Sequence, residues 1–484
     1  MQGSAISAAI HIAAVSGLYI AVAMLIPSAI DLYYSNPDWQ VFAVSAFFVG
    51  GVCLAIALAT RNEPPPFSKR LGFLVVNILW LWLSICGAVP FYLSSLELNL
   101  ASSFFESVSA ITTTGSTIMS NISDAPPGIL IWRSLLQWMG GIGILALGLF
   151  ILPALRIGGF AFFKLESSET NDKPFSRFII FARALMAVYI VLTVACALCY
   201  GIAGMPAFDA INHAMTTIST AGFSTHDASL GHFDSLAVLW VGIVFMIIGG
   251  LPFSILILLV ARGRLDALKD PQIYFFLSCV LLLGVGVGVY LRLGLEMEFA
   301  EALTHAFFNM ISILTTTGYS SQDYTAWGPA VVVLVFFVSF MGGCAGSTTG
   351  GMKSYRFIVI GNTIRAGLYR LVYPHAINTV RYGARAVDQE FQHTVFLFTG
   401  AFFALWIVGA IALSTFGYDF ITAMSGSATA IANVGPGIGP IIGPAGNFAP
   451  LQDGAKVILS ILMLLGRLEV LTVLVILTPI FWRD

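Results

Sequence analysis

Four short segments of the sequence each place a glycine directly after a run of small and hydroxylated residues. They read SAITTTGST, TTISTAGFST, ISILTTTGYSS and TAIANVGPG, and their glycines are Gly115, Gly222, Gly318 and Gly435. Glycine permits the extended or left-handed backbone that can turn carbonyl oxygens toward a common axis. Rings of such oxygens can replace the hydration shell of a cation. The predicted chemistry of these segments is therefore binding of a dehydrated metal cation.

The residues predicted to line this cation site are the four that end at each glycine. They are Thr112, Thr113, Thr114 and Gly115; Ser219, Thr220, Ala221 and Gly222; Thr315, Thr316, Thr317 and Gly318; and Ala432, Asn433, Val434 and Gly435. Threonine hydroxyls can add ligands or hold the backbone in place. Small residues also permit close packing of helices. That explanation suits a single glycine, but not a glycine at the same place four times.

The composition places such a site inside a membrane. The chain has 484 residues, of which 58% are hydrophobic and 10% charged, and its mean hydropathy is +0.91. Soluble domains carry roughly 25% charged residues, so a soluble protein is excluded and a polytopic membrane protein is expected. The first apolar run, about 8–30, has no Lys or Arg before it. It is interpreted as a membrane helix that is retained, not as a cleaved signal peptide.

Ten apolar runs are long enough to cross a bilayer. They are 8–34, 38–60, 70–94, 130–153, 178–203, 235–262, 271–294, 328–361 (interrupted), 391–415 and 454–481. Lys and Arg gather in alternate connections, which predicts that both termini are cytoplasmic. Of the 22 basic residues only Arg133, Arg292, Lys456 and Arg467 lie elsewhere. For Arg133, Arg292 and Lys456 we expect the charged end to reach the membrane interface.

Four further segments, 99–115, 206–222, 298–318 and 418–435, are too short and too polar to cross the membrane. Each lies between an outward-going and an inward-going span, and non-helical backbone at this depth must be buried or line a watery path. We therefore predict an all-α polytopic fold with four parallel helix–pore-loop–helix repeats around one pore, after an N-terminal two-helix hairpin. The predicted boundaries are 1–66 for the hairpin and 67–160, 161–265, 266–386 and 387–484 for the repeats.

Two features of the short segments support this arrangement. A short helix that descends to each glycine points the negative end of its dipole at the membrane centre, which favours a cation there. The position nine residues before each glycine is polar in the first three repeats; the residues are Glu106, His213, Asn309 and, in the fourth, Gly426.

The segment SFMGGCAGSTTGG, Ser339 to Gly351, interrupts the span predicted at 328–361. The stretch from Gly346 to Ser354 has the look of a phosphate-binding loop, but its glycine and Lys353 are not adjacent and it follows an apolar run, so nucleotide binding is rejected. The first glycine of the interrupting segment lies about as far after Gly318 as Gly140 lies after Gly115. We therefore expect a flexible gate under the cation site, in the third repeat only. The candidate gate residues are Gly342, Gly343, Gly346, Ser347, Thr348, Thr349, Gly350, Gly351 and Arg467.

Arg467 occupies a place where the other repeats have glycine. The matching pairs are Gly140-Gly141, Gly249-Gly250, Gly342-Gly343 and Gly466-Arg467. A cation at bilayer depth costs roughly 2.5–3.5 kcal/mol and usually faces a polar path or a partner. Two interpretations stay open at this point: Arg467 pairs with Glu469 or another internal acid, or it faces the pore and repels cations when the path is closed.

Taken together, these features resemble the membrane subunits of the Trk/Ktr/HKT superfamily. The resemblance covers essentially the whole chain: four helix–pore-loop–helix units, one glycine in each loop, and a broken helix in the third unit. The extra hairpin at about 8–60 resembles the TrkH/TrkG branch, not the shorter Ktr branch.

This resemblance implies K+ uptake across the bacterial inner membrane by a homodimer embedded in lipid. It also implies control by a cytosolic nucleotide-binding subunit of the TrkA type, and it favours the pore-facing role of Arg467. K+ is then the cargo, and we expect no organic cofactor, no nucleic acid partner and no enzyme activity. The basic stretch from Lys353 to Arg385 serves either membrane topology or docking of the regulatory subunit.

Two other classes of membrane protein fit the sequence less well. An ion-coupled secondary transporter expects inverted repeats and acids inside the membrane, whereas these repeats run the same way and the deep acids are few, Glu106 and Glu469. No Ser/His or His/Asp/Glu constellation in the sequence supports an intramembrane enzyme. Whether K+ flow is coupled to H+ or Na+ stays open. Because loop four departs from the others, we expect only a moderate preference for K+ over Na+, with Rb+ passing nearly as well.

Overall fold

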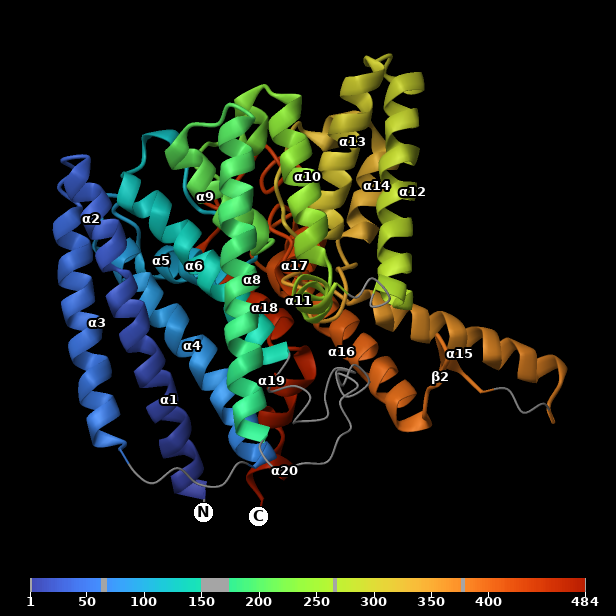
Figure 1. Cartoon of the computed structure of the whole chain (residues 1–484), viewed down its shortest axis with the longest axis horizontal. Coiled ribbons are helices and arrows are strands. Elements are labelled where there is room, and N and C mark those ends of the chain that lie inside the picture. The colour runs from blue at the N-terminus through green and yellow to red at the C-terminus, as the bar shows by residue number, and fades with distance from the viewer. Residues whose placement is uncertain (1, 62–67, 149–173, 264–267, 376–378, 484) are drawn as a thin grey trace.

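A computed structural model describes residues 2–61, 68–148, 174–263, 268–375 and 379–483, and most of this part is helical (Figure 1). Most long helices run side by side, and both chain ends lie at the same end of the bundle. The first half comprises α1 (Gln2–Ala23), α2 (Leu25–Tyr33), α3 (Trp39–Ala59), α4 (Lys69–Leu93), α5 (Leu100–Ile111), η1 (Ile122–Asp124), α6 (Pro127–Ala146), α8 (Pro174–Ile202), α9 (Ala207–Ile218), η4 (Ser229–Phe233), α10 (Leu236–Gly250) and α11 (Phe253–Arg262).

The second half contains two further units in which a long helix is followed by a short one. It comprises α12 (Pro271–Gly294), α13 (Phe299–Leu314), η6 (Tyr324–Trp327), α14 (Pro329–Val338), α15 (Ser354–Val372), β1 (Arg381–Tyr382), β2 (Arg385–Ala386), α16 (Gln389–Ser414), α17 (Phe420–Ala432), α18 (Asp453–Arg467), α19 (Val470–Leu477) and α20 (Pro479–Trp482). The two strands form one short antiparallel hairpin.

Four short helices confirm the predicted segments that do not cross the membrane. They are α5, α9, α13 and α17, and they lie among the longer helices in the upper half of Figure 1. Each packs against the long helix that precedes it, α4, α8, α12 or α16. Side-chain caps fix where some of them begin: Asn99 accepts from the N–H of Ser102, and Asp419 accepts from the N–H of Ile421. Such caps satisfy backbone donors that the first turn leaves open.

The long spans differ from the prediction in the second helices of the repeats. Over the described residues, seven helices are long and apolar enough to cross a membrane, or nine if each bent pair counts as one. The spans predicted at 235–262 and 454–481 are bent pairs: α10 meets α11 at 100°, and α18 meets α19 at 109°. The end of the span predicted at 130–153 lies outside the described residues. The expectation of a break in the third repeat only is therefore wrong.

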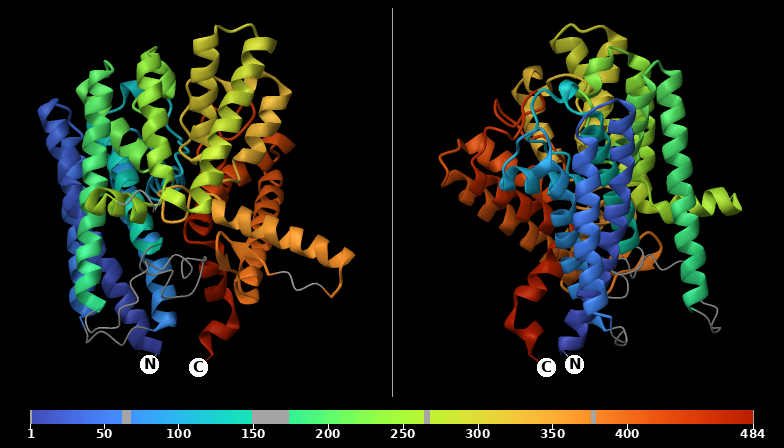
Figure 2. Two further views of the ribbon diagram at one scale, coloured as in Figure 1. Left: turned by 45° about the vertical axis from the view of Figure 1, so that its right-hand side comes forward. Right: turned by 90° about the vertical axis from the view of Figure 1, so that its left-hand side faces the viewer.

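Local chemistry accounts for these breaks. Pro252 lacks the N–H that would continue α10 and follows Leu251 in extended backbone. Glu469 has a φ of 59°, which no helix accommodates, and it separates α18 from α19. In the third repeat, residues 339–353 form a loop, and α15 then leaves the bundle sideways (Figure 2). The second helices of repeats two, three and four are thus all interrupted.

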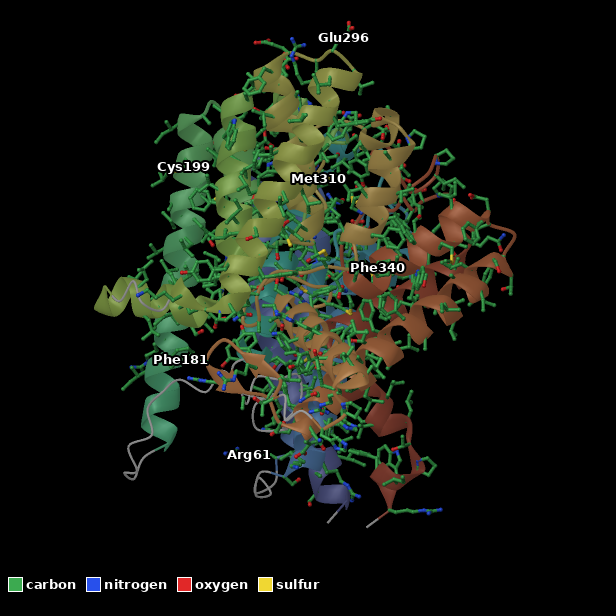
Figure 3. All side chains as sticks on the ribbon, turned by 90° about the vertical axis from the view of Figure 1, so that its right-hand side faces the viewer. Arg61, Phe181, Cys199, Glu296, Met310 and Phe340 are labelled. Atoms are coloured by element: carbon green, nitrogen blue, oxygen red, sulfur yellow. The ribbon has the colours of Figure 1, made fainter. Side chains whose placement is uncertain are left out.

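Two charged residues mark the opposite ends of the bundle. Glu296 lies at one tip, and Arg61 lies near the opposite end, close to the chain termini (Figure 3).

Candidate functional site

The four short helices end in the same backbone motif. At the end of α5 the N–H of Thr113 donates to the carbonyl of Ala110 at 3.0 Å, and the N–H of Thr114 donates to the carbonyl of Ser109 at 2.9 Å. This pair of bonds is the Schellman motif, which requires a left-handed residue after the helix. The equivalent two bonds end α9, α13 and α17. The motif aims all four helix ends at the glycine segments, so we call residues 112–115, 219–222, 315–318 and 432–435 loops 1 to 4.

The left-handed residue of each motif belongs to the predicted cation site. The residues and their φ angles are Thr113 (54°), Thr220 (49°), Thr316 (55°) and Asn433 (55°). A β-branched threonine at positive φ is a true outlier, and such strain gathers at functional sites. Asparagine adopts this conformation more readily. Asn433, which makes loop 4 depart in sequence, therefore preserves the backbone shape of the other three loops.

The four predicted glycines close a ring. A Cβ on each would overlap or touch the carbonyl oxygen of the residue before the glycine in the next loop. In ring order the contacts are Gly115 to Ala221, Gly222 to Thr317, Gly318 to Val434, and Gly435 to Thr114. All four glycines have positive φ, between 78° and 110°. A side chain is thus excluded both by the backbone conformation and by the neighbouring carbonyl, and the cycle of contacts returns to its first member.

Polar side chains of the short helices hold the chain that follows each glycine. The bonds are Ile118 N–H to the Glu106 carboxylate at 2.9 Å, His213 Nε2 to Ser224 Oγ at 3.0 Å, Ser321 N–H to Asn309 Oδ1 at 3.2 Å, and Ile438 N–H to Ser425 Oγ at 3.0 Å. This explains why the position nine residues before the glycine is polar in repeats one to three. In the fourth repeat Gly426 has no side chain, and Ser425, one residue earlier, makes the equivalent hydrogen bond. The sequence did not point to Ser425.

The predicted gate residues lie against the ends of three short helices. Thr348 Oγ1 donates to the carbonyls of Ile218 and Gly249, each at 3.1 Å. The N–H of Gly350 donates to Thr316 Oγ1 at 2.6 Å, and the N–H of Gly351 donates to the carbonyl of Ala432 at 2.8 Å. We call residues 339–353 the intramembrane loop. Its bonds connect it to the ends of α9, α13 and α17.

The bend between α10 and α11 provides the other anchor of the intramembrane loop. Because the helix stops at Gly250, its last carbonyls have no helical partner. The N–H of Cys344 donates to the carbonyl of Gly250 at 2.9 Å, and the carbonyl of Gly346 accepts from the N–H of Phe253 at 2.9 Å. From α12, Gln272 Oε1 accepts from the N–H of Ala345 at 2.8 Å. The break in the second repeat thus supplies the partners for the loop of the third.

A cavity lies between the intramembrane loop and the break of α18 and α19. Its lining residues are Ile144, Gly148, Gly346, Ser347, Thr349, Gly350, Gly351, Lys353, Phe398, Gly466, Arg467 and Glu469. The Arg467 side chain is only 3% exposed, and none of its three nitrogens has a hydrogen-bond partner among the described residues. Lys353 Nζ donates to the backbone carbonyl and hydroxyl of Thr349. Two cationic side chains therefore border this cavity.

Glu469 pairs with Arg356 and not with Arg467, which stands two residues before it in the sequence. Its Oε2 is 2.5 Å from Nη2 of Arg356, and that guanidinium also lies 3.5 Å from the centre of the Phe398 ring. The interpretation that Arg467 is neutralised by Glu469 is therefore wrong. Arg467 lines the cavity beneath loop 4 instead.

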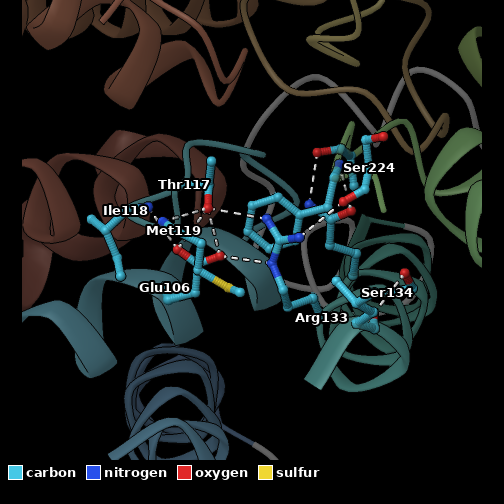
Figure 4. Close-up of polar contacts among 11 residues, drawn as sticks. Glu106, Thr117, Ile118, Met119, Arg133, Ser134 and Ser224 are labelled. Carbon is cyan, nitrogen blue, oxygen red and sulfur yellow. Dashed lines mark hydrogen bonds and ion pairs between the residues drawn. The ribbon is translucent and has the colours of Figure 1, made fainter. Parts of the chain in front are cut away.

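Two basic residues expected at the membrane interface are buried. Arg133 is 1% exposed, and its Nε lies 2.8 Å from Glu106 Oε1 (Figure 4). Lys456 is 6% exposed, and its Nζ donates to Ser102 Oγ at 3.0 Å. Both sit on helices that pack against α5, so their side chains meet polar groups of that helix and do not turn to the interface. Arg292 is different, since it bonds the Met297 carbonyl at an exposed place.

The fold and the loop geometry define a class: a multi-pass helical membrane protein in which four re-entrant helices meet around one axis. The model of a family described as "TrkH: Cation transport protein" matches residues 36–287 and 294–481. The chain belongs to this TrkH family.

Individual relatives match this chain over nearly their full length. The chain is 41% identical to the Trk system potassium uptake protein TrkI of Halomonas elongata, covering 98% of this chain and 96% of that protein. It is 36% identical to TrkH of Escherichia coli K12, covering 95% and 96%. The crystal structure of the potassium transporter TrkH from Vibrio parahaemolyticus superposes with a TM-score of 0.92 at 35% identity, over 100% of both chains.

Proposed function

We propose that the protein takes up K+ across the bacterial inner membrane through a pore in which loops 1 to 4 form a carbonyl selectivity filter. The observation that carries this proposal is the closed ring of contacts between each filter glycine and the carbonyl of the next loop. It is supported by the four helix ends directed at that ring, since their negative dipole ends favour a cation. It is also supported by relatives named as potassium uptake proteins.

The intramembrane loop and Arg467 are the gate in this proposal. The loop is hydrogen-bonded to the ends of three short helices, as expected of a barrier in its closed position. Arg467 adds an unneutralised positive charge at the cavity below. A cation that leaves the filter meets both a steric and an electrostatic obstacle.

A cytosolic nucleotide-binding subunit of the TrkA type opens this gate in our proposal. The basic segment from Lys353 to Arg385 begins where the intramembrane loop ends, so a protein bound to it can pull on the loop directly. Both chain ends lie at the same end of the bundle as Arg61, which supports cytoplasmic termini by the positive-inside rule. The functional unit is a homodimer in lipid, with repeat boundaries at 67–160, 161–265, 266–386 and 387–484.

Flux into liposomes tests the proposed function. The purified protein, with and without its nucleotide-binding partner, is reconstituted and 86Rb+ uptake is measured against competing K+ and Na+. We expect uptake that K+ suppresses at lower concentration than Na+. Absence of cation flux with the partner present, or equal suppression by both ions, contradicts the proposal.

A further inference from the structure

A buried polar network lies behind loops 1 and 2 (Figure 4). Arg133 on α6 donates from Nε to Glu106 at 2.8 Å, from Nη1 to the carbonyl of Ser224 at 2.9 Å, and from Nη2 to Thr117 Oγ1 at 3.1 Å. Glu106 also accepts from the N–H of Ile118 at 2.9 Å. Every charged group in the network therefore has several partners. A buried network with its groups satisfied rigidifies its surroundings.

Gln137, one turn further along α6, reaches the same neighbouring loop. Its Nε2 donates to the carbonyl of Ala221 at 2.8 Å, and its Oε1 accepts from the N–H of Phe223 at 3.1 Å. These two bonds bracket Gly222. The Arg133 guanidinium also lies 4.0 Å from the centre of the Phe223 ring. A helix of the first repeat thus holds residues 221 to 224 of the second repeat.

The other second helices lack this pair of anchors. Arg133 and Gln137 stand seven and three residues before Gly140, the first glycine of its pair. The residues seven and three positions before Gly249, Gly342 and Gly466 are Gly242 and Met246 in α10, Val335 and Ser339 at α14, and Leu459 and Met463 in α18. None of these is charged. Anchoring by an Arg and a Gln of a second helix is therefore specific to loop 2.

We propose that Arg133 and Gln137 are positioning residues that set ion selectivity by holding loop 2 at a fixed place in the ring. The Ala221 oxygen that Gln137 binds is the oxygen that faces Gly115 in the ring of contacts. A loop that is tied to α6 on both sides of Gly222 cannot follow a smaller ion inward, so the ring resists closing around Na+. The charge-assisted bonds of Arg133 hold the segment just beyond it. This inference rests on the proposed function.

Substitutions in α6 separate positioning from folding. Gln137→Met gives the first repeat the residue that repeats two and four carry at this place, and it removes both bonds at similar volume. Arg133→Lys keeps the charge beside Glu106 but loses the planar fork that reaches Ser224 and Thr117. The matched control is Ser134→Ala, because Ser134 is equally buried on the same helix and its hydroxyl bonds only Leu130 of that helix.

The readout is the K+/Na+ permeability ratio from reversal potentials in proteoliposomes, together with the maximal 86Rb+ flux. For Gln137→Met the ratio should fall about fivefold or more, because each of the two lost hydrogen bonds is worth about fivefold, while maximal flux stays near that of the wild type. Arg133→Lys should lower the ratio in the same direction, and Ser134→Ala should leave it unchanged.

Two results overturn the inference: an unchanged ratio in both folded variants, or an equal fall in Ser134→Ala. Gln137→Met and Arg133→Lys are measured separately. If one of them does not fold, the permeability ratio of the other decides. A wild-type protein without K+ flux contradicts the proposed function itself. A K+-selective wild type whose variants keep the same ratio contradicts only the positioning role.

Discussion

Arg356 and Glu469 form a buried ion pair, with Nη2 2.5 Å from Oε2. Glu469 stands only two residues after Arg467 and borders the same cavity, yet its carboxylate is bonded to Arg356. The acid that looks in sequence like the partner of Arg467 is therefore used to hold α15 to α19. Among the described residues Arg467 has no hydrogen-bond partner, and its side chain lines the cavity.

The first prediction concerns the charge of Arg467. Arg467→Ala should raise 86Rb+ flux in the absence of the nucleotide-binding partner. The rise should be about tenfold or more, because at an effective dielectric of 20 two like unit charges repel by about 1.4 kcal/mol or more at any separation below roughly 12 Å. Arg467→Lys, which keeps the charge, is the control and should stay near the wild-type flux. An unchanged flux in a folded Arg467→Ala protein would remove the electrostatic part of the gate.

The second prediction concerns the hydrogen bonds that hold the intramembrane loop in place. Thr348→Val removes the hydroxyl that bonds the carbonyls of Ile218 and Gly249, at almost constant volume. Each lost hydrogen bond is worth about 1 kcal/mol, so partner-independent flux should rise by about fivefold or more. Thr363→Val on α15 is the matched control, because the Thr363 hydroxyl bonds only the Val359 carbonyl of its own helix. Equal fluxes in the two variants would argue against a loop held shut by Thr348.

The third prediction concerns pH at the outer loops. His226 lies between α9 and α10, stacked on His232 with ring centres 3.6 Å apart and with Nε2 3.5 Å from Asp209. Burial lowers the pKa of His226 below its ordinary 6.5, and His232 adds to this, while Asp209 and Asp227 oppose it. The unfolded chain therefore takes up the proton first as pH falls. Stability is fully present above pH 6.5 and declines below it.

The measurement is the Tm of the solubilised protein between pH 7.5 and 5. The wild-type Tm should fall below pH 6.5, and His226→Gln should flatten that fall. His375→Gln, which changes an exposed histidine, should keep the wild-type profile. A His226→Gln profile that is as steep as the wild type would show that another group carries the dependence.

The sequence alone predicts the ring glycines and the short helices, because four matching segments restrict the possible folds strongly. It does not predict the left-handed threonines, since threonine rarely adopts positive φ and only the Schellman bonds reveal it. The bend at Pro252 had a readable signal, a proline inside an apolar run. The bend at Glu469 had none, because neither a proline nor a glycine stands where the backbone turns to positive φ.

The pairing of Arg133 with Glu106 was also within reach of the sequence. Two isolated opposite charges inside apolar or short re-entrant segments are expected to meet, since neither is stable alone at membrane depth. The contact of Gln137 with loop 2 was not, because it depends on how α6 is rotated against the next repeat.

The most direct test of the central claim is the K+/Na+ permeability ratio of Gly318→Ser. A side chain here meets a positive φ and would overlap the Val434 carbonyl of the next loop, so it distorts the ring itself. Gly201→Ala serves as control, because nothing lies within 4 Å of a Cβ at that position. The account predicts a ratio that drops toward one in Gly318→Ser and stays at the wild-type value in Gly201→Ala. A folded Gly318→Ser protein with undiminished K+ preference would contradict the ring as the filter.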